Sequence, residues 1–134
     1  MNANPHNSPL ILIVDDEQAI VAGLALRLGM SGYRTITATN GISGLAAAAE
    51  ARPDLILLDH HMPEMDGVAF VAAFRAIPGE RDVPIVMLSG AVPDPTAIGA
   101  LGVTECLKKP YHKDELLHVV ERVLQPFAAP LSGR

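Results

Sequence analysis

Residues 55–67 read LILLDHHMPEMDG, and this stretch indicates the fold more clearly than any other. Its first four residues are apolar without alternation, which is typical of a short strand buried on both faces of a sheet. The strand then meets Asp59, an acid whose burial is costly unless its charge has a partner. Taken by itself, the stretch allows three explanations: Asp59 caps a turn or helix, binds a metal with His60 and His61, or acts as a nucleophile.

On either side of this stretch, apolar strands alternate with helical patterns. The expected strands are residues 10–14, 33–39, 55–58, 84–88 and 106–108. The expected helices are residues 18–30, 42–51, a segment following an N-cap at Asp66, a weak helix in 94–101, and 113–124. The apolar faces predicted for the first and third helices are Ile20, Val21, Leu24, Ala25 and Leu28, and Phe70, Val71, Phe74 and Ile77. This alternation predicts a doubly wound α/β fold, with a five-stranded parallel sheet and helices on both faces.

The composition fits one domain with an aliphatic core. The chain has 134 residues, of which 49% are hydrophobic and only 4% aromatic. We expect a flexible tail at residues 1–8, a domain at 9–125 and a second flexible tail at 126–134.

Charge and cysteine usage narrow the class of protein. The net charge of −5 argues against direct binding of nucleic acid by this chain. The single cysteine, Cys106, excludes an intrachain disulfide and fits a reducing compartment. The N-terminus lacks the pattern of a signal peptide, and no apolar run approaches the roughly 20 residues of a membrane span. These features predict a cytoplasmic protein with no membrane contact.

Polar side chains follow four of the predicted strands. They are Asp15 and Asp16, then Asp59, Ser89 and Lys109. In open parallel sheets, ligands bind at the carboxyl ends of the strands, so these groups should meet at one edge. Two carboxylates about 4 Å apart repel by roughly 4 kcal/mol at an effective dielectric near 20, so gathered acids favour a bound cation.

Hard oxygen ligands of this kind select Mg²⁺ or a similar ion. A site that combines Mg²⁺, a lysine, a hydroxyl and backbone N–H groups suits phosphoryl oxygens. Asp59 would then be a nucleophile that forms an acyl phosphate, with catalysis by positioning and charge neutralisation.

Each residue also has a simpler structural explanation. Asp15 and Asp16 could cap the next helix, Ser89 could be a turn residue, and Lys109 could be a surface charge. For Asp66, helix capping is the preferred interpretation. A metal site at His60 and His61 lacks a third nitrogen or thiolate ligand. The combination at four strand ends is more specific than any single member.

The motifs resemble those of the response-regulator receiver domains of two-component signalling, the CheY-like family, over about residues 9–125. The similar segments are ILIVDDE, LILLDHHMPEMDG, PIVMLSG and CLKKP. The resemblance implies that Asp59 accepts a phosphoryl group from a phosphohistidine on a sensor histidine kinase or phosphotransfer protein. It also implies that Asp16, Asp59 and the backbone carbonyl of His61 bind Mg²⁺ directly, with Asp15 acting through water.

The resemblance also assigns roles around the phosphoryl group. Ser89 would hydrogen-bond one phosphoryl oxygen after a short inward shift, and Lys109 would pair with another. The backbone of Gly90 and Ala91 would contact the same group. The Lys109–Pro110 bond should be cis, and the strand order should be 2-1-3-4-5. The side chain of His61 would face the mouth of the site and tune the lifetime of the acyl phosphate.

Two features depart from the family pattern. Cys106 occupies a position, three residues before Lys109, where the family usually has Tyr or Phe. The missing aromatic ring puts the usual coupling to the surface in doubt, while Cys106 itself is expected to be a small core residue and not a redox sensor. The segment after Ser89 contains prolines and glycines, so the fourth helix should be short, late or mobile.

Several functions remain open at this point. The leading prediction is a phosphorylation-dependent module that switches a surface for a protein target or a fused output domain, with possible homodimerisation. A phosphate sink or shuttle, or the receiver part of a hybrid kinase, are alternatives, and the Met1 start favours a stand-alone or N-terminal receiver. A metal-dependent phosphohydrolase is disfavoured, because a D-x-D motif, a cap domain and further acidic motifs are missing. A purely structural interaction domain is the remaining possibility. We therefore expect no enzymatic turnover beyond self-phosphorylation and autodephosphorylation.

Overall fold

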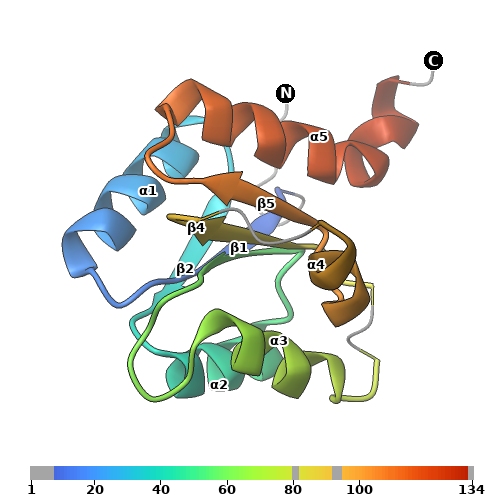
Figure 1. Cartoon of the computed structure of the whole chain (residues 1–134). Helices are drawn as coiled ribbons and strands as arrows, with labels where there is room; N and C mark the ends of the chain where they lie inside the picture. Colours follow the sequence, from blue (N-terminus) through green and yellow to red (C-terminus); the bar gives the residue numbers. More distant parts are fainter. Residues whose placement is uncertain (1–7, 80–81, 92–94, 133–134) are drawn as a thin grey trace.

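The computed structural model describes residues 8–79, 82–91 and 95–132, in which five strands alternate with five helices (Figure 1). The strands are β1 (Leu10–Val14), β2 (Arg34–Ala38), β3 (Leu55–Asp59), β4 (Ile85–Ser89) and β5 (Glu105–Lys108). The helices are α1 (Gln18–Met30), α2 (Gly41–Ala51), α3 (Gly67–Arg75), α4 (Pro95–Leu101) and α5 (Lys113–Ser132).

All neighbouring strands of the sheet are parallel, in the order β2-β1-β3-β4-β5. Helices α1 and α5 cover one face, whereas α2 and α3 cover the other (Figure 1). The predicted α/β class and the strand order 2-1-3-4-5 are therefore confirmed.

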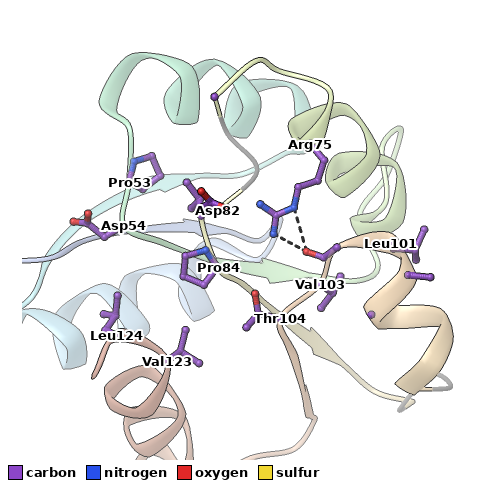
Figure 2. Close-up of a pocket in the computed structure, with 15 residues that line it drawn as sticks. Pro53, Asp54, Arg75, Asp82, Pro84, Leu101, Val103, Thr104, Val123 and Leu124 are labelled. Carbon is purple, nitrogen blue, oxygen red and sulfur yellow. Dashed lines mark hydrogen bonds between the residues drawn. The ribbon is translucent and has the colours of Figure 1, made fainter. Parts of the chain in front are cut away.

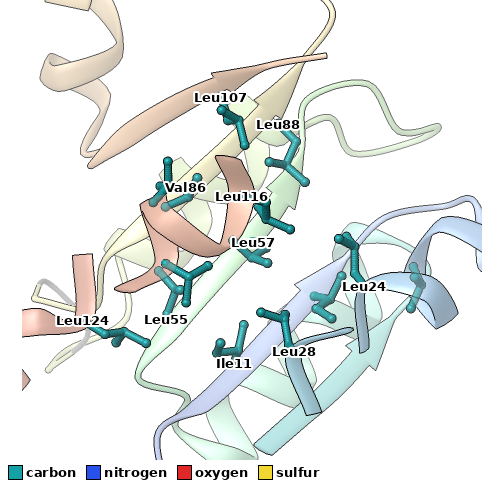
Figure 3. Packing of buried hydrophobic residues seen from close by; sticks show 14 residues of the cluster. Ile11, Leu24, Leu28, Leu55, Leu57, Val86, Leu88, Leu107, Leu116 and Leu124 are labelled. Atoms are coloured by element: carbon teal, nitrogen blue, oxygen red, sulfur yellow. The ribbon is translucent and has the colours of Figure 1, made fainter. Parts of the chain in front are cut away.

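The central strands fill two separate apolar layers, because successive side chains of a strand point to opposite faces. One layer packs strand side chains against α1 and α5, as Figure 3 shows; it includes Ile11, Ile13, Leu55, Leu57, Val86, Leu88, Leu24, Leu28, Leu116 and Leu124. The other packs strand side chains against α2 and α3; it includes Leu12, Val14, Ile56, Leu58, Met87, Phe70 and Phe74. The strand ends that carry the polar residues are thus fixed by a core on both sides.

One predicted core position and one predicted helical position differ from the structure. Ile20 lies on the exposed side of α1, while Val21, Leu24 and Leu28 are buried as expected. The predicted burial of Ile20 is wrong because the buried face of α1 is narrow and contains residues spaced three and four positions apart, starting from Val21. Ile77 lies beyond the end of α3 but still packs against the core.

The last helix is longer than predicted. The expected end at residue 124 is wrong, because α5 continues through Pro126 to Ser132. The prolines suggested a boundary, since a proline in a helix interior removes a backbone hydrogen bond. The flexibility of the two tails stays a prediction, and residues 1–7, 133 and 134 lie outside the described part of the chain.

The fourth helix is short, as the sequence predicts. Helix α4 has seven residues, and it is followed by Gly102 at φ +95, a conformation that favours glycine. The predicted start at Asp94 lies outside the described residues. Within the described part of the chain, none of the helices has the combined length and apolar character that crossing a membrane requires.

Candidate functional site

Four strands bring the predicted polar residues to the same edge of the sheet. Asp15 directly follows β1, Asp59 and Ser89 are the last residues of β3 and β4, and Lys109 directly follows β5. The backbone N–H of Lys109 donates to the Ser89 carbonyl over 2.7 Å, which keeps the ends of β4 and β5 together. The rule that places ligands at the carboxyl ends of strands thus correctly located this cluster.

Three carboxylates share this edge with one ammonium group. One carboxylate oxygen from each of Asp15, Asp16 and Asp59 lies within 4.8 Å of the others. Lys109 Nζ donates to Asp59 Oδ1 over 2.8 Å and lies 4.0 Å from Asp15 Oδ2. Asp15 and Asp59 are buried, whereas Asp16 is exposed. The negative charge therefore exceeds the positive charge inside the site.

Asp15 contains the least satisfied atom of the cluster. Its Oδ1 accepts a hydrogen bond from the Glu17 N–H, but its buried Oδ2 accepts none among the described residues. Burial raises the pKa of the Asp15 carboxyl, and the neighbouring negative charge of Asp59 raises it further. The hydrogen bond from the Glu17 N–H and the positive charge of Lys109 lower this pKa, but they do not cancel the increase. A buried carboxylate oxygen of this kind calls for a cation.

Lys109 keeps its charge because of Asp59. Burial on its own lowers the pKa of the Lys109 ammonium. The hydrogen bond that Lys109 donates to Asp59 and the negative charge of Asp59 outweigh burial, so that the pKa is raised overall. The site therefore combines a fixed positive charge with an oxygen-rich cluster.

Mg²⁺ fits this arrangement. The clustered ligand atoms are hard carboxylate oxygens, and the buried Oδ2 of Asp15, which accepts no hydrogen bond among the described residues, lies among them. Histidine is not part of the cluster: His60 Nδ1 is bonded to Ser89 Oγ at 3.0 Å, and its ring stacks on the exposed His61 at 4.5 Å. The arrangement does not favour the alternative of a histidine metal site.

The hydroxyl of Ser89, a predicted site residue, forms its hydrogen bonds outside the carboxylate cluster. This hydroxyl donates to the Ala91 carbonyl over 2.6 Å and also accepts from the Ala91 N–H at 3.3 Å. Within the described residues it has no hydrogen bond to Asp59 or Lys109. Gly90 and Ala91 are exposed at the end of β4, next to the cluster. Sequence reasoning missed the contact between Ser89 and His60, which lie 29 positions apart, because no local pattern indicates it.

The loop between Asp59 and α3 is held at both ends. Asp66 Oδ1 accepts from the Ala69 N–H at 2.9 Å, which confirms the predicted N-cap. The Gly67 N–H donates to the His60 carbonyl over 2.8 Å. A Cβ at Gly67 would lie 3.0 Å from both the Asp59 carbonyl oxygen and the His60 Cα. Sequence reasoning missed Gly67, although a glycine at a helix start where other residues are preferred was the available indication.

The end of β5 has two features that the sequence anticipated. The Lys109–Pro110 peptide bond is cis, as the resemblance implies. Cys106 is partly buried against the α2 and α3 layer, and this burial raises the pKa of its thiol. A thiol in this environment fits a packing role better than a reactive one.

A separate cavity lies at the opposite end of the sheet. It has a volume of about 950 Å³ and is lined by residues that precede β3, β4 and β5, among them Asp54, Pro84 and Thr104 (Figure 2). Arg75 crosses it, and its Nη2 and Nε donate to the Gly102 carbonyl over 2.6 and 3.2 Å. No predicted site residue lines this cavity.

Comparison with curated proteins finds relatives among bacterial regulators. PrrA of Mycobacterium tuberculosis, a transcriptional regulatory protein, is 40% identical over 120 residues, which are 88% of this chain and 51% of that protein. GlrR of Escherichia coli K12, also a transcriptional regulatory protein, is 33% identical over 129 residues, which are 96% of this chain and 29% of that protein. The chain thus spans about half or less of the length of these relatives.

Solved structures resemble the whole fold. The chemotaxis protein CheY4 of Vibrio cholerae superposes with a TM-score of 0.82 at 35% identity, covering 87% of this chain and 99% of that one. The receiver domain of the sensor histidine kinase PA1611 of Pseudomonas aeruginosa, solved with magnesium coordinated in its active-site cleft, gives a TM-score of 0.78 at 28% identity, with coverage of 87% and 98%.

A family model defines the class directly. The response regulator receiver domain model matches residues 11–121. Together with the parallel sheet and the acidic strand ends, this match shows that the chain belongs to the family of response regulator receiver domains of two-component signalling.

Proposed function

We propose that this domain accepts a phosphoryl group on Asp59 from the phosphohistidine of a sensor histidine kinase or phosphotransfer protein, with Mg²⁺ as the cofactor. The observation that carries the proposal is the buried Asp59 carboxylate, held 2.8 Å from Lys109 Nζ at the end of a rigid strand. A nucleophile needs such positioning, because most of the catalysis in phosphoryl transfer comes from geometry and charge neutralisation.

In the proposed reaction, an Asp59 carboxylate oxygen attacks phosphorus and forms an acyl phosphate. The bond between phosphorus and the histidine nitrogen of the donor breaks, and its electron pair stays on the imidazole. Lys109 is already placed beside Asp59 and would pair with one phosphoryl oxygen. The Ser89 hydroxyl and the backbone N–H groups of Gly90 and Ala91 would bind the others.

We assign the metal to the acidic cluster. Asp16, Asp59 and the backbone carbonyl of His61 would hold Mg²⁺ directly, and Asp15 would act through a bound water. Bound Mg²⁺ would supply positive charge that offsets the charge of the phosphoryl oxygens. The buried Oδ2 of Asp15, which accepts no hydrogen bond among the described residues, and the excess of carboxylates over ammonium groups support this assignment.

The consequence of phosphorylation is a changed protein surface around α4 and β5. The longer regulators that this chain resembles favour a fused output domain or a separate protein target, with homodimerisation as a further route. Cys106 favours a second candidate, a phosphate sink or shuttle, because a small side chain at this position cannot relay a ring movement to the surface. We place the domain in the cytoplasm, with no direct contact to nucleic acid.

Amide NMR tests the function and separates the two candidates. Spectra would be recorded with Mg²⁺ alone and then with Mg²⁺ and beryllofluoride, a mimic of the phosphoryl group. Shifts at residues 59–61 and 89–91 that spread to α4 and β5 indicate a switch. Shifts confined to the site indicate a sink or shuttle, and their complete absence would contradict the proposal. Steady release of phosphate from a phosphoester beyond one equivalent per chain would instead indicate a phosphohydrolase.

The side chain of His61 offers a finer test of the site mouth. His61 is exposed and lies two residues after Asp59, so we expect His61→Asn to change the autodephosphorylation rate. The decay of the phosphorylated protein, followed on phosphate-affinity gels, measures this rate. An unchanged rate would remove the proposed role of this side chain.

A further inference from the structure

The Ser89 hydroxyl is fully engaged in hydrogen bonds outside the carboxylate cluster. Its Oγ lies 2.6 Å from the Ala91 carbonyl oxygen, 3.3 Å from the Ala91 nitrogen and 3.0 Å from His60 Nδ1. A serine hydroxyl has one donor hydrogen and two acceptor lone pairs. These three contacts use all of them, on a side chain that is almost completely buried.

The distances decide where the hydrogen lies. Two oxygens 2.6 Å apart repel unless a hydrogen lies between them, so Ser89 Oγ donates to the Ala91 carbonyl. The hydroxyl then has no hydrogen left for His60. His60 must therefore carry a proton on Nδ1 and donate it to Ser89 Oγ.

His60 is a well-fixed donor. Its backbone N–H donates to the Leu88 carbonyl over 2.9 Å, and its own carbonyl accepts from Gly67 over 2.8 Å. Its ring stacks on that of His61 at an interplanar angle of 23°. Because the donor is fixed, a movement of Ser89 Oγ away from Ala91 towards another acceptor breaks this bond.

Binding a phosphoryl oxygen requires such a change. The hydroxyl must redirect its single hydrogen away from the Ala91 carbonyl, and the Ala91 N–H must leave Ser89 Oγ before it can donate elsewhere. The bond from His60 opposes this rearrangement, because it stabilises the arrangement in which Ser89 faces Ala91.

We propose that His60 is a positioning residue that holds the Ser89 hydroxyl against Ala91 and thereby weakens the binding of a phosphoryl group at Asp59. The inference rests on the proposed function of Asp59. It concerns a side chain that touches neither the carboxylate cluster nor Lys109 among the described contacts, and that acts through Ser89.

The test compares His60→Phe with the wild-type domain. Phenylalanine keeps an aromatic ring for stacking but cannot donate a hydrogen bond. The affinity for beryllofluoride in saturating Mg²⁺ is measured by titration of the Ala91 amide signal. Loss of one such hydrogen bond should tighten binding about two- to tenfold. His60→Asn retains a side-chain N–H, so its affinity should lie between those of the wild type and His60→Phe. The control variant His118→Phe, at an exposed position remote from the site, should leave the affinity unaltered.

A double-mutant cycle shows whether His60 acts through Ser89. In a Ser89→Ala background, His60→Phe should no longer change the affinity, since the acceptor is gone. An unchanged or weaker affinity of the His60→Phe variant would overturn the inference. An effect of His60→Phe that persists in the Ser89→Ala background would also overturn it, as would a His60→Asn variant that binds as tightly as His60→Phe. Failure of the wild-type domain to bind beryllofluoride would instead overturn the proposed function.

The histidine proton gives an independent signature. Nitrogen NMR of the imidazole should find His60 protonated on Nδ1 in the domain without beryllofluoride, and the Nδ1 signal should shift when beryllofluoride binds. A proton on Nε2 alone would contradict the inferred donor.

Discussion

The two ends of the sheet carry different kinds of polar residues. At the carboxyl end, Asp15 is buried with one oxygen that lacks a hydrogen bond, and Lys109 is shared between two acids. At the amino end, Arg75 crosses a cavity of about 950 Å³ but donates twice to the Gly102 carbonyl. The amino end thus combines a large hollow with a well-satisfied charge. A reactive site is therefore recognised by unsatisfied charge at the strand ends and not by the size of a cavity.

Exchanging one acid at each end should produce the largest contrast. Asp59→Asn removes the proposed nucleophile, so we expect complete loss of phosphorylation by acetyl phosphate in Mg²⁺. Intact-mass spectrometry measures the added phosphoryl group. Asp54→Asn is the matched control at the amino end, where Asp54 Oδ2 accepts from the Leu10 N–H at 2.8 Å. Phosphorylation of the Asp59→Asn protein at an equal level would refute the assignment.

At the amino end of the sheet, a substitution should change the stability of the domain and not its phosphorylation. Arg75→Met removes both hydrogen bonds to the Gly102 carbonyl, and hydrogen bonds from charged groups contribute about 1.5–3 kcal/mol each. Because the two donors share one carbonyl acceptor, we count them as a single hydrogen bond. We therefore expect the free energy of unfolding to fall by about 2 kcal/mol in urea titrations, while phosphorylation of the folded protein is retained.

Arg27→Met serves as the control for this change. Arg27 makes an exposed ion pair with Asp114 at 3.3 Å, and such pairs are worth about 0–1 kcal/mol. An Arg75 variant as stable as the Arg27 variant would mean that the cavity end does not depend on this arginine.

Asp15→Asn should stabilise the metal-free domain. The folded-state pKa of Asp15 is raised by burial and by Asp59, so ionisation of Asp15 opposes folding. In EDTA at pH 7.5, removal of this charge should raise the free energy of unfolding by about 1–2 kcal/mol. The gain should shrink as the pH falls towards the unfolded-state pKa near 3.9, where the wild-type carboxyl is also neutral.

Magnesium should narrow this difference. Mg²⁺ at about ten times its dissociation constant stabilises the wild-type domain by about 1.4 kcal/mol. The Asp15→Asn variant should gain less. Urea unfolding in EDTA and in Mg²⁺, at pH 4.5, 6 and 7.5, measures both effects. A gain that is independent of pH and of Mg²⁺ would separate Asp15 from the metal site.

The smallest expected effect is at the amino end of β3. Arg52 ends α2 with φ 53 and ψ 67, a left-handed conformation that favours glycine. Arg52→Gly should raise the free energy of unfolding by about 0.5–1 kcal/mol and leave phosphorylation unchanged. Thermal unfolding followed by circular dichroism measures the change. Destabilisation would show that the Arg52 side chain contributes more to stability than its left-handed backbone conformation costs.

The sequence predicted most of the fold because the local patterns agree with the packing. Unbroken apolar runs such as residues 55–58 fill both layers of the core, and Asp66 caps the helix after the acidic loop. The order of the strands came from the family resemblance and not from the patterns themselves. Helix α5 was predicted too short, because proline indicates a boundary without fixing it.

The site was predictable up to its side-chain orientations. Asp15, Asp16, Asp59 and Lys109 converge because backbone topology places strand ends together. The direction of the Ser89 hydroxyl could not be predicted, since it depends on a histidine that follows a different strand. Torsion angles set by contacts between distant segments leave no pattern in a single sequence.

Gly67 carries a consequence for how substitutions at this site are interpreted. A side chain there would press on the backbone of Asp59 and His60, which cannot yield without moving the strand end. In a saturation library selected for phosphorylation, position 67 should strongly favour glycine, although glycine offers no group to bind or react. Intolerance to mutation beside an active site can thus report the space that the backbone needs.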